Sequence, residues 1–325
     1  MSVSAIGKNR PFRDLSGLKV AIATIFENQN NYGQRLQAYA LCRFIRDQFG
    51  CNCVVVDARR NRNELKSFQE FQDRSMGTIR ISCQEDIRKF SPDAVVLGGD
   101  QVLNVDWFSL GSIGGGILKM GYEQFSYSSS DGGYSMCGSS EKVSDNVKIL
   151  KGFLGLSVRE VQTKPYLEKK TGMDVNVHLD PVFLLDAGHW RSLERKPEFI
   201  KDGEVFDVEY KCEDSPFQEH VQKDGSKKYG IFGNNVRNDG VSPENFLWMI
   251  DHCRKFQTSS FHGTAFAYIF RRPQIKISNL GNLRVKSMME KLEVKVCGET
   301  VEYGDFDRVL ASEVGKSREY LRKNL

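Results

Sequence analysis

The sequence predicts an α/β protein made of two domains that face each other across a cleft. Short apolar runs alternate with stretches of helical periodicity, first over residues 18–185 and again from residue 229. At 325 residues, the chain also exceeds the roughly 250 residues beyond which one hydrophobic core tends to split. We therefore expect an N-terminal domain over 1–185, a connection or irregular insertion over 186–228, and a smaller C-terminal domain over 229–325.

The N-terminal domain begins with a strand, a helix and a second strand. The apolar run LKVAIATIF at 18–26 is typical of a buried parallel strand. QRLQAYALCRFIRDQFG at 34–50 has apolar residues at helical spacing and ends at Gly50, a common residue at helix ends. CNCVVVDAR at 51–59 supplies the next strand. This order is that of a βαβ unit, which indicates an open α/β sheet.

Further apolar runs predict the remaining strands of this domain. They lie at 93–100, 124–130, 153–160 and 174–185, and a helix is expected over 161–171. Polar clusters follow several of these strands, and open α/β sheets bind ligands at the carboxyl ends of their strands. The loops are therefore expected to carry the chemistry.

The C-terminal domain repeats the pattern after a charged segment of little periodicity. Three strands are expected in YGIFGN, KFQTSS and QIKIS, and two helices in SPENFLWMIDHC and GTAFAYIF. Ser242 is a natural N-cap for the first helix, with Pro243 at its first position. Residues 305–325 predict an amphipathic helix that is free to pack back on the first domain.

Composition narrows the class of protein. No stretch approaches the roughly 18 apolar residues of a membrane span, and the N-terminus lacks the apolar core of a secretory signal, so a soluble, cytoplasmic protein is expected. Eight cysteines without a CxxC pair indicate free thiols and no metal site. Lys and Arg exceed Asp and Glu only as 46 to 42, which predicts no nucleic-acid partner but suits an anionic or membrane-associated substrate.

The segment TSSFHGT at 258–264 is the first candidate for a site. If a helix begins at Gly263, the backbone N–H groups of its first turn, including that of Thr264, would attract an anion. His262 would stand beside this anion as a proton donor or a cationic ligand. The alternative is a capping or buried histidine that the backbone satisfies, and the sequence leaves both open.

Other polar residues lie at the ends of predicted strands. Arg159 could bind a carboxylate or phosphate in bidentate fashion, although a salt bridge with Glu160 or with an acid of the other domain would explain it equally well. GGDQVLN at 98–104 offers donors and acceptors that suit sugar hydroxyls. The loop ENQNNYG at 27–33 is not a GxGxxG loop, so no dinucleotide site is expected.

Five segments, taken in order, resemble motifs of the polysaccharide pyruvyl transferase family. They are NNYGQRLQAYAL at 30–41, GGDQVLN at 98–104, SVRE at 157–160, LDPVFLL at 179–185 and TSSFHGT at 258–264. Five ordered matches are much more specific than any one of them.

The resemblance implies a glycosyltransferase-B-like fold, in which two Rossmann-like domains face each other across a cleft. It also implies transfer of the enolpyruvyl group of phosphoenolpyruvate onto two hydroxyls of a sugar, which gives a pyruvate ketal and phosphate. The acceptor would belong to a surface polysaccharide, such as a capsule or exopolysaccharide, or to its lipid-linked precursor. Phosphoenolpyruvate would be a co-substrate, with no cofactor or metal. A peripheral contact with the inner membrane face and a homo-oligomer are both compatible with this hypothesis.

The resemblance also implies roles for single residues. His262 is the expected acid or phosphate ligand, Arg159 the partner of the donor's carboxylate or phosphate, and Asp100 the group that orients or deprotonates an acceptor hydroxyl. The C-terminal domain is expected to bind phosphoenolpyruvate and the N-terminal domain the acceptor. Further donor-site residues are Ser260, Gly263, Thr264 and Arg284, and the acceptor side is expected to comprise Asn31, Tyr32, Gln37, Gln101 and Asn104.

Some positions depart from the family pattern. Ser260 stands where some members have an arginine, so that Arg271, Arg272 or Arg284 would have to replace one contact. Ser259, Gly99 and Leu103 also differ from the usual aspartate, serine and tryptophan. Two alternatives therefore stay open: a nucleotide-sugar-dependent glycosyltransferase on the same fold, and a noncatalytic sugar-binding protein with a degenerate site.

Overall fold

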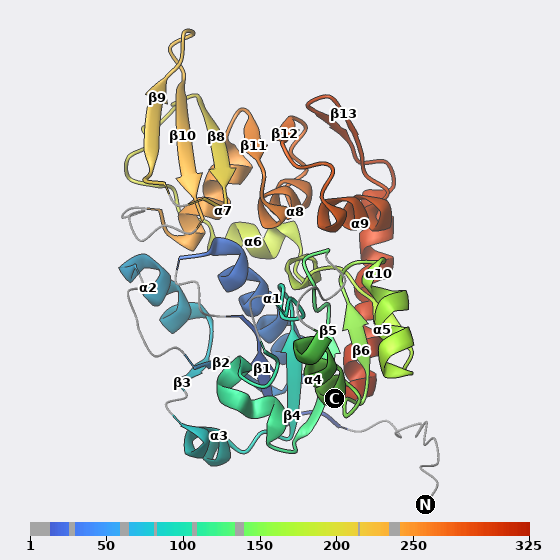
Figure 1. The fold of residues 1–325 in the computed structure, drawn as a ribbon. Coiled ribbons are helices and arrows are strands. Elements are labelled where there is room, and N and C mark those ends of the chain that lie inside the picture. The colour runs from blue at the N-terminus through green and yellow to red at the C-terminus, as the bar shows by residue number, and fades with distance from the viewer. Residues whose placement is uncertain are drawn as a thin grey trace, which may run out of the picture.

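A computed structural model of the chain describes residues 14–25, 30–58, 65–80, 83–105, 109–133, 140–213, 215–233 and 241–325. Two sheets lie one above the other in Figure 1, the first blue to green and the second yellow to orange. Helices α1, α6, α7 and α8 lie between them in this view. The predicted α/β class is confirmed.

The first sheet is parallel throughout and has the order β3-β2-β1-β4-β5. A short parallel pair, β6-β7, continues it beyond β5, because Ser126 N–H donates to the Gly155 carbonyl at 3.0 Å. This is the strand order of a doubly wound sheet, in which ligands bind where the chain reverses direction across the sheet. The strands are β1 Lys19–Ala23, β2 Asn52–Asp57, β3 Thr78–Arg80, β4 Ala94–Gly98, β5 Glu123–Tyr127, β6 Leu156–Val158 and β7 Val175–Val177.

Helix α1, Tyr32–Phe49, follows β1 and has a cap at each end. The Asn31 side chain accepts the Gln34 N–H at 3.1 Å, and Gly50 ends the helix in the left-handed conformation, with φ of 66°. Because helices cover this sheet, its strands are almost entirely buried. The other helices of this domain are α2 Lys66–Ser75, α3 Gln84–Phe90, the 3-10 segment η1 Ile113–Lys119, α4 Ser140–Leu150 and α5 Thr163–Thr171.

The second sheet has the order β12-β11-β8-β10-β9, parallel except for the antiparallel edge strand β9. Its strands are β8 Phe206–Lys211, β9 Gln218–Val221, β10 Lys227–Phe232, β11 Phe256–Thr258 and β12 Ile275–Ile277. The central strand β8 lies in the segment 186–228, where a connection or irregular insertion was expected, so this prediction is wrong for residues 206–221. The strand was not predicted because acidic residues interrupt its apolar pattern. In the fold these residues form ion pairs: Asp207 binds Arg254, and Glu209 binds Lys228.

The chain between and after the sheets forms helices and one hairpin. The strand expected over 174–185 covers only 175–177, because Asp180 and Pro181 begin a 3-10 turn. Helix α10 returns to the first sheet, where Tyr320 donates to the Ser126 carbonyl at 2.9 Å (Figure 1). These elements are η2 Pro181–Leu184, α6 Ala187–Leu193, α7 Pro243–His252, α8 Phe261–Ile269, α9 Leu283–Leu292, β13 Lys295–Cys297, β14 Thr300–Glu302 and α10 Phe306–Asn324.

One hydrophobic core runs from the first sheet into the second. It includes Val20 and Leu36 of the first domain and Tyr210 and Phe266 of the second. At its centre, the Tyr32 ring stacks on Phe246, with centroids 4.4 Å apart. The two domains are therefore joined by a continuous apolar contact on one side of the site.

An acidic pair lies at the contact between α6 and α7. Arg191 binds Asp251 with two hydrogen bonds of 2.7 and 3.2 Å, whereas Glu194 Oε1 is buried and has no partner among the described residues. Burial, together with the charge of Asp251, raises the pKa of Glu194 to about 7. The fold therefore favours the protonated form of Glu194.

The substitution Glu194→Gln tests whether burial raises the pKa of Glu194. Because the folded-state pKa lies above the ordinary value, the contribution of Glu194 to stability is complete at low pH and is lost as the pH rises through about 7. We expect the variant to melt about 2–4 °C above the wild type at pH 8 and much closer to it at pH 5. The exposed Glu198→Gln is the control. Equal pH dependence of Tm in all three proteins would contradict the assignment.

Candidate functional site

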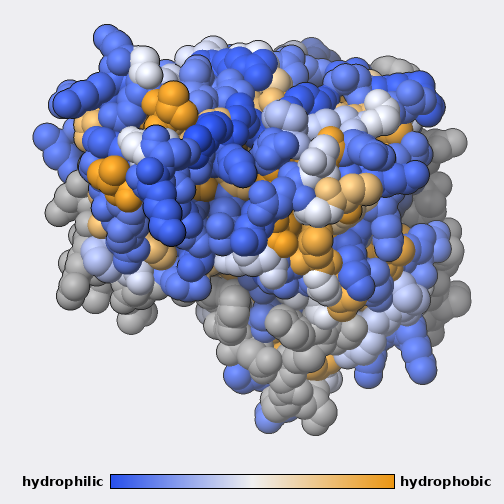
Figure 2. All heavy atoms as spheres, turned by 90° about the horizontal axis from the view of Figure 1, so that it is seen from above, coloured by the Kyte–Doolittle hydropathy of each residue, from blue (hydrophilic) through white to orange (hydrophobic). Residues whose placement is uncertain are grey.

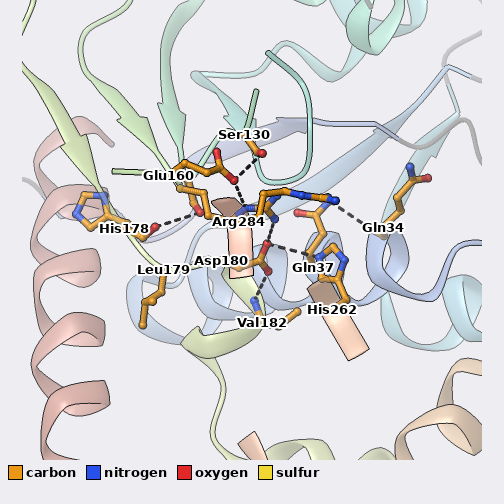
Figure 3. Close-up of polar contacts among 12 residues, drawn as sticks. Gln34, Gln37, Ser130, Glu160, His178, Leu179, Asp180, Val182, His262 and Arg284 are labelled. Atoms are coloured by element: carbon orange, nitrogen blue, oxygen red, sulfur yellow. Dashed lines mark hydrogen bonds and ion pairs between the residues drawn. The ribbon is translucent and has the colours of Figure 1, made fainter. Parts of the chain in front are cut away.

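Residues from four of the five sequence motifs meet between the two sheets. Figure 3 shows Asp180 between His262 on one side and Glu160 and Arg284 on the other, with Gln37 nearby. Arg159 follows β6, Asp180 precedes η2, and His262 lies in the first turn of α8. The site is thus built from the ends of elements in both domains, as the fold class predicts.

Arg159 is a buried cation, 4% exposed, held by two carboxylates. Its Nη1 donates to Asp180 Oδ2 at 2.6 Å and its Nε donates to Glu160 Oε1 at 2.9 Å. Burial by itself would lower the pKa of Arg159, but the two carboxylates raise it above its ordinary value. The predicted salt bridge with Glu160 is confirmed. It leaves Nη2 buried and without an acceptor among the described residues.

Asp180 connects Arg159 to His262. Its Oδ1 accepts the Val182 N–H at 3.1 Å, which fixes the carboxylate at the start of η2. Its Oδ2 accepts from Arg159 and lies 3.5 Å from His262 Nε2. Burial would raise the pKa of Asp180, but the charges of His262 and Arg159 hold it at about 2. Asp180 lies in the LDPVFLL motif and had no predicted role, although an acid inside an apolar run requires a buried partner.

His262 is 8% exposed, and its Nε2 is a buried atom with no hydrogen-bond partner among the described residues. Its ring lies directly on Gly33 of α1. A Cβ atom built at position 33 would be only 2.1 Å from His262 Nδ1. Glycine is therefore required in the NNYG motif, because any side chain would displace the imidazole.

The anion site expected at Gly263 and Thr264 is not formed by their backbone. Helix α8 begins at Phe261, two residues earlier than predicted, with Ser260 as its N-cap. The Gly263 N–H donates to Ser260 Oγ at 3.4 Å and the Thr264 N–H to the Ser260 carbonyl at 3.1 Å. The predicted roles of Gly263 and Thr264 as free donors are therefore wrong. Ser260 itself is a helix cap, and its contact with a substrate stays a prediction.

Arg284 is the second arginine at this site. It lies in the first turn of α9, half-buried, and its Nε donates to Asn282 Oδ1 at 3.3 Å. Burial and the nearby charge of Arg159 lower the pKa of Arg284. The Asp100 carboxylate acts on both arginines. Asp100 follows β4 in a left-handed conformation, with φ of 49°.

Arg271 and Arg272 do not replace the arginine that some family members have at the position of Ser260. Both lie at the far end of α8, away from His262. Arg271 binds Asp307 and covers the Phe306 ring, and Arg272 donates to the carbonyls of Asp251 and Cys253. Of the three candidates, only Arg284 belongs to the site.

The residues predicted to bind the acceptor are buried or cap a helix. Tyr32 is fully buried and donates to the Val241 carbonyl at 2.9 Å, and its contact with an acceptor stays a prediction. Its ring packs in the hydrophobic core between the two domains. Gln37 is also fully buried, and its Nε2 donates to Thr24 Oγ1 at 3.1 Å. Asn31 caps α1, while Gln101 and Asn104 are buried after β4. Roles for Asn31, Gln37, Gln101 and Asn104 in acceptor binding stay predictions.

Other features of the described residues bear on the predicted class. Their seven cysteines are free thiols, as expected.

Glu194, Asp251 and His252 place ligand atoms within 4.8 Å of one another. Asp251 already binds Arg191, and His252 Nδ1 bonds to the Trp248 carbonyl at 2.9 Å. No helix in the described ranges is long and apolar enough to cross a membrane. The face seen from above is mainly hydrophilic (Figure 2).

Two doubly wound sheets that share a site define a glycosyltransferase-B-like protein. Solved structures support this fold. The S. aureus MnaA–UDP structure has a TM-score of 0.52 at 11% identity and covers 94% of this chain and 90% of its own. UDP-GlcNAc 2-epimerase from Neisseria meningitidis, bound to UDP-GlcNAc, has a TM-score of 0.50 at 11% identity and covers 94% of both chains.

The sequence identifies the family more closely. The family model described as polysaccharide pyruvyl transferase matches residues 31–281. The chain therefore belongs to the polysaccharide pyruvyl transferase family. No curated protein matches this sequence.

Gly33→Ala tests the contact between the domains. Alanine normally favours a helix over glycine, but here its Cβ would collide with the His262 ring. We expect a loss of about 1–3 kcal/mol in the free energy of unfolding, measured by urea denaturation. Gly315→Ala in α10 is the matched control, because its Cβ would meet open space and should stabilise by about 0.5–1 kcal/mol. Equal effects of the two substitutions would contradict the contact.

Proposed function

We propose that the protein transfers the enolpyruvyl group of phosphoenolpyruvate onto two hydroxyls of a sugar, forming a pyruvate ketal. The acceptor is a sugar of a surface polysaccharide or of its lipid-linked precursor. The observation that carries the proposal is a pair of buried nitrogens, Arg159 Nη2 and His262 Nε2. Neither has a hydrogen-bond partner among the described residues, and the two side chains face the same carboxylate oxygen of Asp180.

These two nitrogens favour an anionic ligand. A buried donor without an acceptor costs about 1–3 kcal/mol, so a stable fold keeps two of them together only where something compensates that cost. Phosphoenolpyruvate offers phosphate and carboxylate oxygens, which arginine and imidazolium bind through charge-assisted hydrogen bonds. Arg284 adds a third basic group near Arg159, whose charge lowers the pKa of Arg284.

The side chains present can support each step of the transfer. Protonated His262 donates its proton to the methylene carbon of phosphoenolpyruvate, and positive charge develops at the adjacent carbon. One sugar hydroxyl attacks that carbon and loses its proton, for which Asp100 is the proposed base. The bond to the phosphate oxygen breaks, and the phosphate leaves with its electron pair while Arg159 and Arg284 stabilise its charge. The second hydroxyl then closes the ketal and releases the remaining proton.

Membership of the family supports a transferase in polysaccharide biosynthesis, with a sugar acceptor and phosphoenolpyruvate as the donor. No separate cofactor enters the scheme, and we propose a cytoplasmic location, where phosphoenolpyruvate is available. The second candidate is a nucleotide-sugar-dependent enzyme on the same fold. It is favoured by the ligands of the two similar structures, UDP and UDP-GlcNAc, although their 11% identity supports the fold alone.

A ligand screen separates these two candidates. A ligand that binds only the folded protein stabilises it by RT ln(1 + L/Kd), where L is the ligand concentration, so Tm rises with the logarithm of that concentration once it exceeds Kd. We expect phosphoenolpyruvate to raise Tm and UDP to leave it unchanged. Stabilisation by UDP without any effect of phosphoenolpyruvate would favour the nucleotide-sugar enzyme, and no effect of either would favour a sugar-binding protein with a degenerate site.

Arg284→Ala and His262→Asn test the residue assignment. Removal of a charged donor to an anion costs about 1.5–3 kcal/mol, so Arg284→Ala should weaken phosphoenolpyruvate binding at least about tenfold, measured by calorimetry. Lys286→Ala, an exposed cation of the same helix, should bind like the wild type. His262→Asn should lower acceptor-dependent phosphate release by about 10²-fold or more. Wild-type behaviour of both site variants would refute the assignment.

A further inference from the structure

We propose that Asp180 is a positioning residue for the transfer: it orients the His262 ring and keeps it protonated, so that His262 can act as the acid. This inference rests on the proposed function for its catalytic meaning. The orientation and the protonation can be measured without any turnover.

The Asp180 carboxylate is fixed independently of His262. Asp180 is 1% exposed, and its Oδ1 is held by the Val182 N–H in the first turn of η2. Pro181 follows at the first position of that turn and restricts the backbone. The carboxylate therefore presents Oδ2 to the site in one orientation, and His262 Nε2 lies 3.5 Å from that oxygen.

Asp180 is the carboxylate that lies within ion-pair distance of His262. Burial of an imidazole disfavours the protonated form, and a carboxylate nearby restores it. Nε2 lies 3.5 Å from Asp180 Oδ2, Nδ1 faces Gly33, and the uncharged Phe261 ring packs at 5.2 Å. Arg159 is the opposing cation, since it binds the same Oδ2. Asp100 acts on Arg159, and Arg159 in turn acts on Arg284.

The two distances from Asp180 Oδ2 are compatible with proton transfer from His262 to a substrate. Arg159 Nη1 lies 2.6 Å from Asp180 Oδ2, a short hydrogen bond, whereas His262 Nε2 lies at 3.5 Å. At that separation Asp180 stabilises the imidazolium by its charge without holding the proton in a short hydrogen bond. The proton can thus be transferred to a substrate that enters beside Nε2.

Asp180→Asn tests the inference, because asparagine keeps the size of the side chain and can still accept the Val182 N–H. The pKa of His262 is followed by NMR through its ring Cε1–H signal, which is assigned by its loss in His262→Asn. We expect the pKa of His262 to fall by about one unit or more in Asp180→Asn. The exposed His220 serves as the internal reference and should not change. An unchanged pKa of His262 would overturn the inference.

A second pair of proteins covers the case in which Asp180→Asn fails to fold, since it leaves Arg159 with one buried carboxylate fewer. Arg159→Gln is compared with the double variant Arg159→Gln/Asp180→Asn, in which the buried pair is removed as a whole. The pKa of His262 must be about one unit or more lower in the double variant than in the single variant. Equal pKa values in the two proteins would overturn the inference as well.

Kinetics then separate positioning from a merely structural role. In Asp180→Asn, kcat for acceptor-dependent phosphate release should fall at least about tenfold, and the fall-off of kcat at high pH should begin at lower pH than in the wild type. Asp180→Glu keeps the charge and should recover part of kcat and the wild-type pH profile. An unshifted pH profile in Asp180→Asn would contradict positioning. No turnover in the wild type would refute the proposed function and leave the NMR result standing.

Discussion

The buried carboxylate of Asp180 is the constraint on which the rest of the site depends. A charge 1% exposed is tolerated only with a partner, and Asp180 faces one basic side chain from each domain: Arg159 after β6 and His262 at the start of α8. Their arrangement therefore couples the packing of the two domains to the chemistry of the site. The same shared carboxylate explains why Arg159 keeps one unpaired nitrogen, since its other two are already engaged.

The contact between the domains sets these distances. The Tyr32–Phe246 stack forms the apolar part of the contact, and the ring of His262 rests on Gly33 one residue along α1. The adjacent residues Tyr32 and Gly33 thus have different roles. Tyr32 packs in the core, and Gly33 leaves room for the imidazole of His262. Arg159, Asp180 and His262 are all at most 8% exposed, so the three side chains are largely shielded from solvent.

The sequence was sufficient for the fold class and most elements, because apolar periodicity, Gly50 and Ser242 mark them locally. It failed at β8, where Asp207 and Glu209 depend on Arg254 and Lys228, partners far along the chain. The site was predicted in part. The motifs contain His262 and Arg159, and the family resemblance suggested Arg284. The role of Asp180 depends on two residues 21 and 82 positions away. The Ser260 cap and the burial of Tyr32 likewise follow from packing that local patterns do not contain.

A crystal structure of the protein with phosphoenolpyruvate tests the central claim most directly. We expect density for the ligand between Arg159 and His262, with phosphate or carboxylate oxygens about 2.7–3.2 Å from Arg159 Nη2 and His262 Nε2 and Asp180 still bound to Arg159. Phosphoenolpyruvate bound elsewhere, with both nitrogens still lacking a hydrogen-bond partner, would contradict the proposed site.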